Sequence, residues 1–196
     1  MKLNSCCGNV PLKGYRNIDK YYYPGSPYIL TDQKAVEAWE QDIGSGSYWG
    51  YGDATKLEFE SDYFDEVIMV HGLEHLDMGQ GSLAIMEAYR VLKPGGSLEI
   101  EVPDLLKACA LMPTVHVTPT GDNQPWHRVM GLLYGTDGTD GAGQYHLCGY
   151  TQEYLRFKLE ERGFKEIEEV PVGYGHGNDE EGHAEPQYDF RLRGVK

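Results

Sequence analysis

The sequence has few of the features that mark several common protein classes. Its four cysteines, Cys6, Cys7, Cys109 and Cys148, form no CxxC pair and no zinc-like spacing, so neither a disulfide scaffold nor a zinc finger is indicated. It has no run of about 18 apolar residues, so we expect no membrane span. Its first residues do not resemble a secretory signal, and we therefore expect a cytoplasmic protein with reduced thiols.

Basic residues are also scarce. Seventeen lysines and arginines oppose 31 aspartates and glutamates, which gives a net charge of −14. Such a surface repels phosphate backbones at long range, so we do not expect a nucleic acid partner. The G-x-G-x-x-G fingerprint of nicotinamide-dependent Rossmann enzymes is absent, which argues against that class.

Four histidines raise the question of a metal: His116, His127, His176 and His183. Their spacing matches no zinc pattern. The acidic segment that carries the last two could bind a divalent cation weakly, but a solvated acidic loop is the favoured interpretation. The sequence therefore predicts no metal site.

The pattern of elements predicts a single α/β domain over residues 1–196. A continuous apolar run, Val67 to Val70, indicates a central strand buried on both faces. The expected strands are 2–6, 15–19, 48–52, 64–70, 97–104, 164–172 and 187–196. The expected helices are 35–41, 82–92, 105–112, 125–134 and one from the N-cap Thr151 to the C-cap Gly163. Residues 93–96, "KPGG", are expected to end the second helix.

Two details modify this picture. Only residues 9–14 separate the first two strands, which is too short for an ordinary crossover helix. Glu99 and Glu101 alternate with apolar residues, so we expect one face of the sheet to be partly uncovered there.

The motifs "LNSCCGN", "GYRNID", "FDEVIMVHGLEHL" and "YRVLKPGGSLEIEVPDL" together resemble the class I S-adenosylmethionine-dependent methyltransferases. The resemblance implies a doubly wound, seven-stranded, mostly parallel sheet with its last strand antiparallel and a shortened or missing first helix. It implies S-adenosylmethionine as cofactor and methyl transfer by in-line displacement to a small-molecule or sugar-type acceptor. Residues 105–150 are then expected to form an insertion on the acceptor side.

The resemblance also implies which residues bind the cofactor. Asp19 would accept hydrogen bonds from the ribose, Asp53 would accept from the adenine amine, and Gly72 would let the backbone approach the ligand. Strand-end turns explain both aspartates without a ligand. The full predicted set is Cys6, Cys7, Gly8, Asp19, Asp53, Ala54, His71 and Gly72.

Three residues are candidates for catalysis: His75, Asp104 and His146. An imidazole titrates near neutral pH and could take a proton from the acceptor. A packed, hydrogen-bonded histidine is the structural alternative for His75 and His146. Methyl transfer needs little from the protein beyond alignment, since the sulfonium group already activates the methyl.

The first turn departs from the family's G-x-G-x-G pattern, which would fall on Cys6, Gly8 and Val10, so that only Gly8 remains. Cys6 stands where the family has glycine, so a side chain occupies the turn that approaches the cofactor. This departure, with the missing helix, leaves an alternative open: a module that keeps the fold, and perhaps cofactor binding, without catalysis. The sequence does not indicate the acceptor or the oligomeric state.

Overall fold

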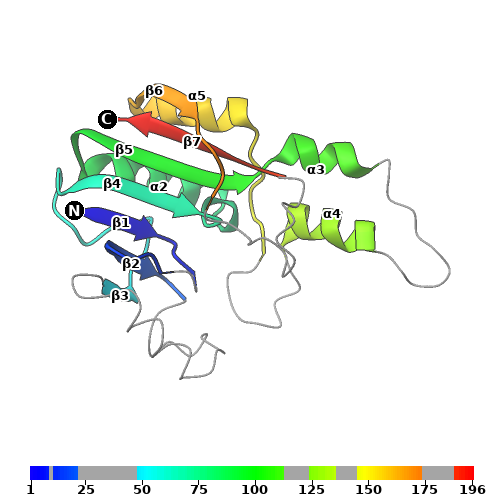
Figure 1. The fold of residues 1–196 in the computed structure, drawn as a ribbon, viewed down its shortest axis with the longest axis horizontal. Helices are drawn as coiled ribbons and strands as arrows, with labels where there is room; N and C mark the ends of the chain where they lie inside the picture. The colour runs from blue at the N-terminus through cyan, green and yellow to red at the C-terminus, as the bar shows by residue number, and fades with distance from the viewer. Residues whose placement is uncertain (9–10, 22–47, 113–123, 136–144, 174–187) are drawn as a thin grey trace.

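A computed structural model describes residues 1–8, 11–21, 48–112, 124–135, 145–173 and 188–196, with residues 124–128 described by their backbone alone. Seven strands form one sheet (Figure 1), in the order β3-β2-β1-β4-β5-β7-β6. In this order they are Tyr48–Tyr51, Tyr15–Asp19, Lys2–Ser5, Phe64–Val70, Leu92–Pro103, Asp189–Val195 and Lys165–Glu169. Strand β7 is antiparallel to both β5 and β6, whereas β1 to β5 pair in parallel.

The described helices take two positions. Helices α2 (Met78–Val91) and α5 (Gln152–Arg162) pack on one face of the sheet, and the short η1 (Leu73–His75) follows β4. Helices α3 (Leu105–Leu111) and α4 (Gln124–Tyr134) lie beyond the carboxyl end of β5 and contact each other (Figure 1). The carboxyl edge of the parallel strands is thereby flanked by α3 and α4, and ligands of open α/β sheets bind at that edge.

Asparagine side chains replace a crossover helix between β1 and β2. The Asn17 amide nitrogen donates to the carbonyl of Leu12 at 3.0 Å, and its oxygen accepts from the Leu12 N–H at 2.7 Å. Asn4 donates to the same oxygen at 2.9 Å, and both asparagines are buried. The described part of the link contains no helix, as expected. The asparagine side chains instead satisfy backbone polar groups of this short connection between the two parallel strands.

The core lies between the sheet and helices α2 and α5. Leu98, Ile100 and Val102 of β5 are fully buried and join the apolar residues of α2. Helix α2 begins at the N-cap Asp77, which forms a capping box with Gln80. It therefore begins four residues earlier than the sequence predicted.

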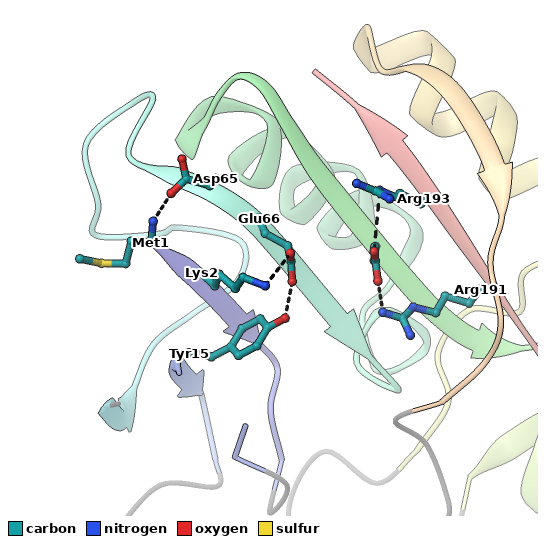
Figure 2. Close-up of polar contacts among 8 residues, drawn as sticks. Met1, Lys2, Tyr15, Asp65, Glu66, Arg191 and Arg193 are labelled. Carbon is teal, nitrogen blue, oxygen red and sulfur yellow. Dashed lines mark hydrogen bonds and ion pairs between the residues drawn. The ribbon is translucent and has the colours of Figure 1, made fainter. Parts of the chain in front are cut away.

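The opposite face of the sheet carries charged side chains that neutralise one another (Figure 2). Glu66 of β4 pairs with Lys2 at 3.0 Å and accepts from the Tyr15 hydroxyl. Glu99 pairs with Arg191 and lies 3.8 Å from Arg193, both on β7. Opposite charges on adjacent strands favour this register.

This arrangement corrects the expectation for Glu99 and Glu101. Glu101 is buried and the side chain of Glu99 is only 15 % exposed, so their alternation does not mark an uncovered face. Ion pairing lets carboxylates lie largely covered within a sheet face on which Lys2 and Arg193 stay about half exposed.

Several strand boundaries are corrected as well, and the last two strands are shorter than expected. Helix α2 ends at Val91, just before the KPGG segment, as predicted. The first strand ends at Ser5 because Cys6 adopts a positive φ of 59°, and the third ends at Tyr51. The segment 93–96 lies within β5, where Gly95 N–H donates to the Lys196 carbonyl and Lys196 N–H to that of Gly96. The expected strands 15–19 and 64–70 and the caps Thr151 and Gly163 are confirmed, whereas the expected helix 35–41 lies outside the described residues.

Candidate active site

The turn after β1 is held by the acid at the end of β2. Asp19 accepts from the Gly8 N–H at 2.9 Å with one carboxylate oxygen and from the Tyr21 N–H at 2.8 Å with the other. Gly8 has a φ of 53°, a conformation that costs glycine little. The structure therefore brings the predicted residues Gly8 and Asp19 into direct contact.

Cys6 and Cys7 occupy the centre of this turn as neutral thiols. Burial raises the pKa of both, and the nearby Asp19 carboxylate raises it further. Cys7 is buried and its thiol lies 3.4 Å from the Gly8 carbonyl. A protonated, buried thiol is a poor nucleophile, so the two cysteines fill space in the turn.

The side chain of Cys6 leaves room only for glycine at position 72. A Cβ at Gly72 would lie 2.3 Å from the Cys6 Cβ and 3.0 Å from its sulfur. Cys6 itself holds a left-handed φ of 59°, which costs a non-glycine residue about 1–2 kcal/mol. The contact gives Gly72 a packing role beside its predicted role near the cofactor, and it joins the ends of β1 and β4.

Asp53 closes the turn after β3. Its carboxylate accepts from the Thr55 N–H at 2.9 Å and from the Thr55 hydroxyl at 2.7 Å, and it pairs with Lys20 at 2.8 Å. Burial raises the pKa of Asp53, but the Lys20 and Thr55 hydrogen bonds outweigh this and lower it overall. The neighbouring Ala54 is buried. The carboxylate is therefore ionised and can accept further hydrogen bonds.

His71 lies among three carboxylates at the end of β4. Its Nδ1 is 3.1 Å from Glu74, and its Nε2 is 3.7 Å from Glu101 and 3.6 Å from Asp189. Burial lowers the pKa of His71, but the bonds to Glu101 and Glu74 outweigh it and raise the pKa to about 10. His71 is thus an imidazolium at neutral pH and fixes η1 against β5 and β7.

His75 and His146 meet beside η1. Their ring centroids are 4.9 Å apart in an edge-to-face arrangement. Burial lowers the pKa of His146, so this ring is neutral at pH 7. The Glu74 carbonyl accepts from the N–H groups of Leu147 and Cys148, which ties the segment after α4 to η1. Two of the three predicted catalytic residues therefore lie together.

Asp104 is placed differently. Its carboxylate caps α3 by accepting from Leu106 N–H at 3.0 Å and Lys107 N–H at 3.4 Å. The Asp104 backbone forms an isolated bridge with Tyr150. The structure gives this residue a capping function, and no contact among the described residues joins it to His75 or His146. Its catalytic role stays a prediction.

Several residues of this edge were missed by the sequence reasoning. Glu101 and Asp189 contact His71, and Asn17 holds the β1–β2 link. Glu101 and Asp189 come from β5 and β7, so only the three-dimensional pairing of these strands brings them to His71. Asn17 had a local signal, a polar amide in the middle of the expected strand "YRNID".

Comparison with known proteins identifies the kind of domain. A model described as a methyltransferase domain matches residues 28–100. Over these residues, which are less than half of the chain, the protein is similar to methyltransferase domains. The resemblance and the fold class drawn from the sequence are thereby confirmed, and so is S-adenosylmethionine as the cofactor used by proteins of this kind.

Two individual proteins illustrate how far the similarity extends. The 2-methoxy-6-polyprenyl-1,4-benzoquinol methylase of Gallus gallus is 40 % identical over 65 residues, which cover 32 % of this chain and 20 % of that protein. The match thus spans only about a fifth of that relative's length. An S-adenosylmethionine-dependent methyltransferase of Thermotoga maritima shares the fold over the whole chain and 81 % of its own, at 19 % identity and a TM-score of 0.54.

A third protein, phosphoethanolamine N-methyltransferase 2 of Haemonchus contortus, was solved with S-adenosyl-L-methionine. It shares the fold at a TM-score of 0.53 and 17 % identity, over 86 % of this chain and 34 % of its own. No described helix of the present chain is long and apolar enough to cross a membrane.

Proposed function

We propose that this domain transfers the methyl group of S-adenosylmethionine to a small-molecule acceptor, either a phenolic or a sugar-type hydroxyl compound. The observation that carries the proposal is the convergence of Gly8, Asp19, Asp53 and Gly72 on the carboxyl edge of a methyltransferase sheet. That edge is where sheets of this class bind ligands.

The cofactor residues would act mainly by position. Asp19 already holds the Gly8 turn through two backbone N–H groups, and each carboxylate oxygen has lone pairs left for ribose hydroxyls. Asp53 is ionised by Lys20 and Thr55 and can accept from an adenine amine. Aligning the methyl group, the sulfur and the nucleophile can lower the activation barrier by about 7–11 kcal/mol.

The acceptor side supplies the proton chemistry. Attack of an acceptor oxygen on the methyl breaks the sulfur–methyl bond, forms an oxygen–methyl bond and releases S-adenosylhomocysteine and one proton. His146 is neutral, since burial lowers its pKa, so it can accept that proton. General base help of this kind contributes about 10²–10⁴-fold.

Calorimetric titration with S-adenosylmethionine and S-adenosylhomocysteine tests the cofactor part. Binding of both is expected, and absence of binding to either at millimolar ligand refutes the proposal. Activity is then measured as S-adenosylhomocysteine release with hydroquinones and free sugars as acceptors.

A second function is a cofactor-binding module without catalysis. Cys6 favours it, because a side chain occupies the turn where the family has glycine. Binding of the cofactor without product on any acceptor would support this second function, and steady product would eliminate it.

A further inference from the structure

Three metal-binding side chains converge where η1 meets the segment after α4. Glu74 and His75 belong to η1, and His146 lies 14 residues beyond Leu132 of α4. One donor atom from each of the three lies within 4.8 Å of the other two. Donors from distant parts of the chain therefore share one small volume.

Both imidazoles are oriented by a backbone carbonyl. Nδ1 of His75 lies 3.0 Å from the Tyr145 carbonyl, and Nδ1 of His146 lies 3.1 Å from that of Leu132. A carbonyl only accepts, so each Nδ1 carries the proton and each neutral ring keeps its lone pair on Nε2. Histidines that bind metals are typically held in this way, by the nitrogen that does not touch the ion.

Glu74 completes the set with a buried carboxylate. Its Oε1 is bound by Nδ1 of His71 at 3.1 Å, whereas Oε2 is buried and has no hydrogen-bond partner among the described residues. The residue is only 2 % exposed. A buried carboxylate oxygen without a partner is costly, and a cation beside it would remove the cost.

The backbone around these donors is held in place. Leu147 N–H and Cys148 N–H donate to the Glu74 carbonyl at 2.7 and 3.1 Å, and His146 N–H donates to the Tyr134 carbonyl at 3.1 Å. His71, with its raised pKa, holds the far side of the Glu74 carboxylate. The donors thus need only side-chain rotation to close on an ion, whose ligands would stand roughly 3.4 Å apart.

We propose that Glu74, His75 and His146 bind a divalent first-row transition metal ion such as Zn²⁺, through one carboxylate oxygen and two imidazole nitrogens. Two histidines and one carboxylate are a donor set that binds such ions and leaves coordination positions open. This differs from the expectation of no metal drawn from the sequence. A bound ion would occupy the Nε2 lone pair of His146 and so replace His146 as the group that promotes proton loss. An open coordination position could hold an acceptor hydroxyl and lower its pKa. This use rests on the proposed function, whereas the binding itself does not.

Titration of the full chain with Zn²⁺ alone tests the site, with Co²⁺ as a spectroscopic probe of nitrogen and oxygen ligation. The variants are His75→Gln and His146→Gln. The control is the double variant His176→Gln and His183→Gln, which removes the two histidines of the acidic segment. We expect one Zn²⁺ per chain, at least about 100-fold weaker binding in each site variant, and unchanged binding in the control.

The opposite pattern overturns the proposal: site variants that bind Zn²⁺ like the parent, or loss of binding in the control. Absence of stoichiometric binding to the parent chain also overturns it. Thermal unfolding of each variant separates lost ligation from lost folding. If His146→Gln unfolds, the His75→Gln titration decides, since His75 is half-exposed and Gln preserves its polarity. Calorimetry with S-adenosylmethionine is run in parallel, so failure of cofactor binding and failure of metal binding are distinguished.

Discussion

The two halves of the strand-end edge satisfy their polar groups in different ways. On the first half, at the ends of β1 to β3, the carboxylates of Asp19 and Asp53 bind backbone N–H groups of neighbouring turns. On the second half, at the ends of β4 and β5, ionisable side chains such as His71 and Glu74 bind each other. Backbone N–H groups do not titrate, so the first half is a cradle whose charge changes only where its carboxylates protonate, at acid pH. The imidazole–carboxylate contacts of the second half also weaken as the pH rises and the imidazolium loses its proton.

The largest effect should come from breaking the cradle. Asp19→Ala removes two charge-assisted hydrogen bonds and the predicted ribose acceptor, each contributing about 1.5–3 kcal/mol. We expect the Kd for S-adenosylmethionine to rise about 10–100-fold, measured by calorimetry. Asp65→Ala is the matched control, since Asp65 is exposed and its ion pairs among the described residues are with the N-terminus and Lys93. Equal binding by the two variants would refute the role of Asp19.

The second largest effect should come from the contact between Gly72 and Cys6, which joins the two halves. Gly72→Ala places a Cβ 2.3 Å from that of Cys6, an overpacking that we expect to lower the free energy of unfolding by about 1–3 kcal/mol. In the double variant with Cys6→Gly the nearest remaining atom is the Cys6 Cα at 3.7 Å. Chemical denaturation should therefore show that Cys6→Gly rescues Gly72→Ala. Additive losses would contradict this explanation.

The second half, around His71, should make the free energy of unfolding depend on pH. The pKa of His71 is about 10 when folded, above its unfolded value of about 6.5, so its stabilisation is complete below pH 6.5 and is lost as pH rises toward 10. Between pH 7.5 and 8.5 the free energy of unfolding should fall by about 1.4 kcal/mol.

His71→Gln should remove that slope while the pH dependence below 6.5 persists. Urea denaturation at several pH values measures both proteins. A slope that is identical in the variant would assign the pH dependence to other groups.

The smallest effect concerns the turn itself. Cys6→Gly removes a left-handed non-glycine residue, whereas Cys6→Ala keeps its Cβ in that conformation. We expect the glycine variant to be about 1 kcal/mol more stable than the alanine variant and to bind S-adenosylmethionine as well as or better than the parent. Weaker binding by Cys6→Gly would show that the family alignment of this turn is wrong.

The sequence predicted the architecture well because its signals were local. The apolar run Val67 to Val70 and the caps Thr151 and Gly163 act on their own segments, and the structure places each as expected. It could not predict the His71 cluster, because Glu101 and Asp189 lie far along the chain and meet His71 only when β4, β5 and β7 pair. For the same reason Glu99 was mistaken for an exposed residue: its arginine partners arrive with β7.

The asparagine-held link also has a consequence for how the protein folds. Asn4 and Asn17 are separated by 13 positions, whereas Asp65 of β4 lies 64 positions from Met1. Closing a short loop costs less chain entropy, and pairings of low sequence separation form faster. Strands β1 and β2 should therefore pair early and offer a ready template on which β4, and with it the rest of the sheet, assembles.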